Sequence, residues 1–155
     1  MVMRFLLIKI FILFQFQLYA NGSWVKDLSF DNIDIWKNGS KRISVEVKNN
    51  KNKLENYNKE KVQEYLARRN KILKYADFSN FQTSSLKFQK DKDEIRIDNN
   101  GSYLNSRSVK TFFKEIHILS KNKSIITMIT SQKKLTKEDI NDFKKKLNYI
   151  EETNK

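Results

Sequence analysis

The single histidine of the chain, His117, is the first residue to consider for catalytic chemistry. An imidazole acts as a general base only when its partners lie within hydrogen-bond reach. The strand-like alternation around it predicts that Phe113, Glu115, His117 and Leu119 share one face. One carboxylate beside one imidazole completes neither a catalytic triad nor a metal site. We therefore interpret His117 as a partly exposed strand residue and predict no catalytic role for it.

The remaining residue types offer little else that could carry a reaction. The densest acidic stretch contains Asp91, Asp93 and Glu94, but Lys92 interrupts it and it lacks the glycine and spacing of a calcium loop. The chain has no cysteine, which excludes disulfides, thiolate nucleophiles and cysteine-ligated zinc. Three glycines are too few for a phosphate-binding loop or a nucleophile elbow. We predict no catalytic residue, no metal site and no cofactor, and we expect the protein not to be an enzyme.

Positive charge is the strongest compositional feature of the chain. Lys and Arg number 31 against 18 Asp and Glu, which gives a formal net charge of +13 at pH 7. Such a field favours anionic partners such as nucleic acid, phospholipid head groups or acidic polysaccharide. A surface rich in solvated Lys and Asn explains the same composition without any partner, and this alternative stays open. The candidate binding surface consists of six basic residues near the two predicted helices: Arg68, Arg69, Lys71, Lys74, Lys133 and Lys134.

Residues 1–22 have the order of a secretory signal peptide. Arg4 gives a basic start, the stretch 5–19 is almost wholly apolar, and the small residues Ala20 and Gly22 follow. The apolar run is shorter than the ~20 residues that span a bilayer comfortably, although retention as an uncleaved membrane anchor is the alternative. We therefore expect an exported protein, periplasmic or extracellular, in which residues 23–155 form a single domain.

Periodicity in residues 23–155 predicts an antiparallel sheet. Apolar and polar residues alternate from Trp24 to Val47 around the turn at Asn38-Gly39, which predicts a two-stranded hairpin. Further strands are predicted at 81–88, 94–97, 109–119 and 124–130. The last of these approaches a continuous apolar run, which is typical of a central strand covered on both faces. Asn99–Ser102 is interpreted as a turn.

Two further segments have helical spacing. Asn58 is the expected N-cap of a helix that extends to about Ala76. Thr136 is the expected N-cap of a final helix, with Asp139 three residues on as its capping-box partner. Since both helices can pack on the sheet, the predicted fold class is α+β.

The element order resembles the PsbP-like fold of small α/β/α sandwich proteins, which includes exported accessory and assembly factors. The similarity spans roughly residues 24–150 and rests on that order and on the closing unit Phe112–Leu119, Ser124–Thr130 and Thr136–Ile150. It implies a binding or assembly role rather than catalysis. We therefore expect a basic domain that contacts a protein or an anionic envelope component, and that meets a membrane only if the N-terminal segment stays uncleaved. The alternative is a salt-sensitive binder of nucleic acid or another anionic polymer.

Overall fold

Seven strands form one antiparallel sheet in the computed structural model, which describes residues 24–30, 32–51 and 53–153. The strands are β1 (Val25–Phe30), β2 (Ile33–Asn38), β3 (Lys41–Asn49), β4 (Ser79–Lys90), β5 (Glu94–Leu104), β6 (Lys110–Ser120) and β7 (Lys123–Ser131). Their order across the sheet is β1-β2-β3-β7-β6-β5-β4, so that β1 and β4 are the edges and β7 is central. The predicted signal segment, residues 1–22, lies outside the described residues.

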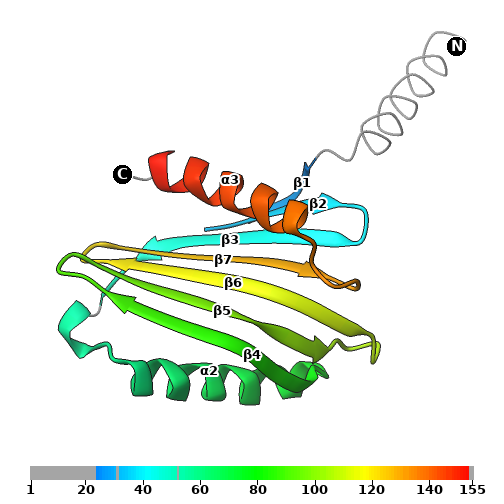
Figure 1. Cartoon of the computed structure of the whole chain (residues 1–155), viewed down its shortest axis with the longest axis horizontal. Helices are drawn as coiled ribbons and strands as arrows, with labels where there is room; N and C mark the ends of the chain where they lie inside the picture. The colour runs from blue at the N-terminus through cyan, green and yellow to red at the C-terminus, as the bar shows by residue number, and fades with distance from the viewer. Residues whose placement is uncertain (1–23, 31, 52, 154–155) are drawn as a thin grey trace, which may run out of the picture.

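Two α-helices lie on opposite faces of this sheet (Figure 1). They are α2 (Lys59–Leu73) and α3 (Lys137–Thr153), and the short 3₁₀ helices η1 (Leu54–Asn56) and η2 (Lys74–Ala76) flank α2. The predicted α+β fold class, with an antiparallel sheet and two packed helices, is confirmed. Within the described part of the chain, none of the helices has the length and apolar character needed to cross a membrane.

Both helix starts have the caps that the sequence predicts. Asn58 accepts a hydrogen bond from the backbone N–H of Lys61 through its side chain, at 2.8 Å. At the start of α3, the N–H of Thr136 donates to Asp139 at 2.9 Å, and the N–H of Asp139 donates to the Thr136 hydroxyl oxygen at 3.2 Å. This reciprocal pair is a capping box with Asp in place of Glu.

The face of the sheet covered by α3 carries the larger core. Ile43 and Ile129 pair in register across β3 and β7, and both are 0% exposed. Phe143 of α3 is equally buried against them. The complete cluster contains Ile43, Val45, Ile116, Ile118, Ile125, Ile129, Phe143, Leu147 and Ile150.

The face covered by α2 has a smaller core near the β4–β5 hairpin. It contains Leu54, Val62, Leu66, Ile95, Ile97 and Leu119. Towards β7, β3 and β2 this face is only half covered, and Ile126 and Met128 of β7 are half-buried. The prediction that this strand is central is confirmed, but its α2 side is not fully covered.

Two sequence-based interpretations were wrong. The segment predicted as a two-stranded hairpin contains three strands, because the apolar alternation changes phase between Phe30 and Ile33 and the chain reverses there. Asn99–Ser102 is not a turn but part of β5, where Gly101 lies opposite Phe113. A side chain at Gly101 would meet the backbone carbonyl of Gln82 in β4, so the glycine serves close strand packing rather than a reversal.

Candidate anion-binding pocket and the adjoining cleft

The structure separates the six basic residues that the sequence singles out. Five of them are exposed, three on α2 and η2 and two in the loop between β7 and α3: Arg68, Lys71, Lys74, Lys133 and Lys134. Arg69 differs from these, because its guanidinium group turns towards the sheet and donates to Glu115 at 2.6 Å. The exposed basic residues therefore belong to two separate regions of the chain, and the Arg69 guanidinium is paired inside the molecule.

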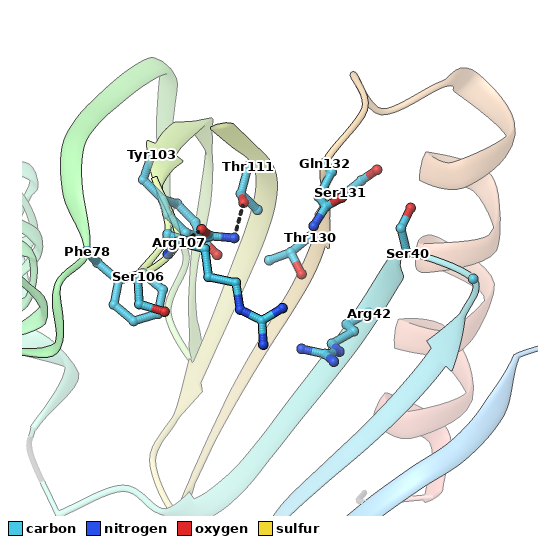
Figure 2. A pocket seen from close by; sticks show the side chains of 12 residues that line it. Ser40, Arg42, Phe78, Tyr103, Ser106, Arg107, Thr111, Thr130, Ser131 and Gln132 are labelled. Carbon is cyan, nitrogen blue, oxygen red and sulfur yellow. Dashed lines mark hydrogen bonds between the residues drawn. The ribbon is translucent and has the colours of Figure 1, made fainter. Parts of the chain in front are cut away.

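A polar pocket of about 400 Å³ lies at one end of the sheet, between the β2–β3 turn, the β5–β6 loop and the end of β7 (Figure 2). We call it the arginine pocket, because Arg42 and Arg107 are its charged residues. Hydroxyl and amide groups supply most of the remaining polar lining, from Ser40, Ser106, Thr111, Thr130, Ser131 and Gln132. No Asp or Glu is among the described residues that line it.

The two guanidinium groups approach the arginine pocket from different elements. Arg42 belongs to β3, where it pairs with Thr130 of β7, and Arg107 belongs to the loop between β5 and β6. Figure 2 shows the two side chains pointing towards each other across the open space. Guanidinium groups carry a full positive charge at every physiological pH and bind carboxylate and phosphate oxygens through several parallel donors. The arrangement is therefore a positive pocket suited to an anion.

Local hydrogen bonds hold the loop that carries Arg107. The side-chain oxygen of Asn105 accepts the backbone N–H groups of Arg107 and Val109, at 3.0 and 3.1 Å. Ser108 has the left-handed backbone conformation, with φ of 57°. On the other side of the pocket, Gly39 has φ of 58° in the β2–β3 turn that presents Ser40. The predicted Asn-Gly turn is thus confirmed. The two turns hold Ser40 and Arg107 at the pocket through contacts within the protein.

An aromatic cluster separates the arginine pocket from a second, apolar space. Tyr103 is its centre, with ring centroids 5.6 Å from Phe78, 5.6 Å from Phe81 and 6.0 Å from Phe113. Burial raises the pKa of Tyr103 above its ordinary value, although the positive charges of Arg42 and Arg69 oppose the shift. The hydroxyl of Tyr103 therefore stays protonated at neutral pH, and it can donate a hydrogen bond.

The apolar space, here called the α2 cleft, has a volume of about 580 Å³ and lies between α2 and the half-covered part of the sheet. Its floor consists of residues of β2, β3, β7 and β6, such as Ile35, Met128 and Phe113, and α2 contributes Tyr65 and Leu73. Volumes of this size are typical of small-molecule sites, which are mostly apolar with a few placed polar groups.

The ion pair of Glu115 and Arg69 lies at the wall of the α2 cleft, and His117 adjoins it from the neighbouring pocket. Glu115 is 2% exposed and binds Arg69 at 2.6 Å and the Nε2 of His117 at 2.7 Å. Burial works to raise the pKa of Glu115, but the bonds and charges of His117 and Arg69 outweigh it and hold that pKa below its ordinary value. The expected exposure of His117 was wrong, because α2 covers it and Tyr65 packs edge-on against its ring at 6.2 Å. The ion pair fixes α2 to the sheet across the cleft.

The described residues contain no group of three or more Asp, Glu, His or Cys side chains placed to hold a metal ion. The groups that the site presents are guanidinium and hydroxyl donors at one end and apolar surface beside them. The sequence analysis missed Arg42 and Arg107, which are 65 residues apart in the chain (107 − 42) and meet only through the pairing of the sheet.

Comparisons with known proteins leave the chain without an assigned family. No family model matches it, and no curated protein matches it. Among solved structures 13 chains match, and one is the protein of unknown function PA94 from Pseudomonas aeruginosa. That chain is 12% identical, with a TM-score of 0.46 over 83% of this chain and 86% of its own length. A likeness at this level carries no argument about what either protein does.

Proposed function

We propose that the protein is an exported, non-enzymatic binding domain that holds an anionic group of an envelope component or of a partner protein. The observation that carries the proposal is the meeting of Arg42 and Arg107 in a pocket that has no acidic lining among the described residues. Opposed guanidinium groups with hydroxyl donors around them favour a phosphate or carboxylate over a neutral ligand. A binding or assembly role is also what the resemblance to the PsbP-like fold implies.

The net positive charge of the protein supports this role through long-range attraction of anions. The full chain has a net charge of +13, of which residues 23–155 keep +11 (29 basic minus 18 acidic residues), and this charge raises the local concentration of anions around the domain and speeds their encounter with it. Lys133 and Lys134 are exposed directly after Gln132, which lines the arginine pocket. In this proposal the exposed lysines steer the ligand, and the two arginines bind it.

The binding test is a titration of the purified protein with inorganic phosphate, followed by NMR shifts of backbone amides. We expect saturable shifts around Arg42, Arg107 and Ser131. The double variant Arg42→Gln/Arg107→Gln should bind ~100-fold more weakly or worse, because two charged hydrogen bonds that contribute ~1.5–3 kcal/mol each are lost.

A charge-matched control is the double variant Lys144→Gln/Lys145→Gln, which changes two exposed side chains of α3. It should bind phosphate as the unaltered protein does. Equal losses in the two double variants would mean that only overall charge matters, and the proposal would be wrong. A loss confined to Lys71→Gln/Lys74→Gln would move the contact to the α2 surface and favour the anionic-polymer alternative.

Export is a separate part of the proposal and has its own test. Intact mass and fractionation of the protein in its own host should give a chain that lacks the first 20 or 22 residues and lies outside the cytoplasm. A full-length protein in the membrane fraction would instead make residues 5–19 an anchor. A full-length protein found soluble in the cytoplasm would contradict export.

A further inference from the structure

The arginine pocket, the aromatic cluster and the α2 cleft lie in a row on one face of the sheet, and we call this row the groove. The pocket and the cleft share Phe78 and Tyr103 as lining residues, so only the aromatic cluster lies between them. The cleft in turn shares Tyr65 and Ile126 with a further pocket of about 660 Å³ that extends to Ser124. A ligand bound between Arg42 and Arg107 therefore has the α2 cleft and the further pocket on one side of it, beyond the aromatic cluster.

The groove follows a single strand. Alternate residues of a strand point to the same face, and on β7 these are Thr130 at the arginine pocket, Met128 and Ile126 in the cleft, and Ser124 at the far pocket. The distance along the strand from Thr130 to Ser124 is ~20 Å at ~3.4 Å per residue. The groove is thus long and narrow, with fixed positive charge at the Arg42 end and mostly apolar surface next to it.

The floor of the groove favours a hydrocarbon chain over a peptide. An extended peptide binds a sheet by pairing with an edge strand, but the strands below the cleft are β2, β3, β7 and β6, which all have neighbours on both sides. The backbone groups of a peptide laid on that face would lack hydrogen-bond partners, at a cost of ~1–3 kcal/mol for each buried group. A hydrocarbon chain has no such groups.

The charged residues of the cleft already have partners within the protein, so a ligand in the cleft needs no charged group to pair with them. Arg69 is paired with Glu115 at 2.6 Å, and Glu46 is paired with Lys48 at 3.3 Å. The charges of the cleft are therefore matched inside the protein, whereas those of the arginine pocket are not matched among its lining residues. A ligand that complements the whole groove has one anionic end and one apolar chain.

We propose that the groove binds a single-chain anionic lipid, with its head group between Arg42 and Arg107 and its hydrocarbon chain along β7 in the α2 cleft. This inference rests on the proposed function, since the head group occupies the same pocket, and it adds the class of molecule that the pocket serves. The aromatic cluster packs against the first carbons of the chain, and Met128 and Ile126 lie below the next ones.

The test is a series of n-alkyl phosphates, from butyl through hexyl and octyl to decyl, titrated into the purified protein by calorimetry below their micelle concentrations. Each added methylene should tighten binding about fourfold, the factor that corresponds to ~0.8 kcal/mol. Affinity that does not rise with chain length would overturn the lipid inference, while binding of inorganic phosphate would leave the arginine pocket intact. Alkyl alcohols that bind as tightly as the phosphates would also overturn it.

A variant in the cleft makes the test specific to this groove. Met128→Gln should flatten the dependence on chain length and leave the affinity for inorganic phosphate within about twofold, because it makes the cleft polar without adding a charge near Arg42. Ile72→Gln is the matched control, because Ile72 is 67% exposed and does not line the groove. If Met128→Gln does not fold, as judged by circular dichroism, Ile35→Gln at the other side of the cleft serves instead. An unchanged chain-length dependence in the folded cleft variant would overturn the proposal.

Discussion

The two faces of the sheet bury their residues to very different extents. On the α3 face, Ile43, Ile129 and Phe143 are 0% exposed and belong to a closed core. On the α2 face, Ile35 and Met128 are only half-buried and line a cleft of about 580 Å³. Over β2, β3 and β7, the α3 face of the sheet therefore stabilises the fold, whereas the α2 face leaves apolar surface uncovered. Substitutions on the first face should cost stability, and substitutions on the second should mainly change binding.

The largest effect should come from truncation in the closed core. Phe143→Ala removes a fully buried ring and should lower the free energy of unfolding by ~3–5 kcal/mol. Met128→Ala on the other face should cost clearly less, because its side chain borders open space and leaves no sealed cavity. Urea denaturation of both variants measures the difference, and equal losses would mean that the α2 face is as tightly packed as the α3 face.

The buried carboxylate Glu115 is a polar contribution of the α2 face to stability, beside the smaller apolar core of that face. Glu115→Gln should cost ~1.5–3 kcal/mol at neutral pH, because charged hydrogen bonds to Arg69 and His117 are lost. The pKa of Glu115 is lowered on folding, so its stabilising effect is present above the ordinary value of 4.5 and disappears as the pH falls below it. The variant should therefore lose less stability than the unaltered protein between neutral pH and acid.

Thermal melts across that pH range measure this effect, with Glu46→Gln as the control. Glu46 also lines the cleft, but its side chain is 28% exposed and its partner Lys48 is in solvent. It should change stability by no more than ~0.5 kcal/mol. A Glu115→Gln variant with an unaltered acid transition would show that the buried group is not coupled to folding.

A smaller effect should follow from filling the close approach of β4 and β5. Gly101→Ala should cost ~1–3 kcal/mol, since its methyl group would meet the Gln82 carbonyl and lie 3.1 Å from the Phe113 ring. Ser102→Ala, at the next position and on the opposite face, is the control and should cost less. Chemical denaturation checks the pair, and a neutral Gly101→Ala would mean that β4 can move away from β5 freely.

Local patterns in the sequence predict most of the helices and turns, because interactions between residues close together in the chain determine where these elements begin and end. Side-chain caps satisfy the first N–H groups of a helix from within a few residues, which is why Asn58 and Thr136 mark the helix starts correctly. The Asn-Gly turn is local in the same way. The third strand at the N-terminus was missed although the phase change between Phe30 and Ile33 signals it, since a shift of one residue moves apolar side chains to the other face.

Features that depend on distant pairing were not predictable. Gly101 resembles a turn residue in the sequence, and only the neighbouring β4 backbone explains it as a packing residue. The burial of His117 depends on where α2 crosses the sheet, and the arginine pocket depends on which strands become neighbours. Arg42 does carry a signal, because it alternates with the buried Ile43 and therefore belongs to the less covered face. Nothing in the sequence links it to Arg107.

The pairing of β3 with β7 also determines how the protein reaches its fold. Strands β1 to β3 and strands β4 to β7 are each joined by short connections and can form as separate meanders. Among the described strands, the two meanders pair where β3 meets β7, and there the Thr127 hydroxyl donates to the carbonyl of Ser44, 83 residues earlier. Closing so long a loop is slow compared with forming hairpins. The groove, whose floor crosses this seam, should therefore be among the last parts of the molecule to form, and a chain interrupted before β7 would lack that floor.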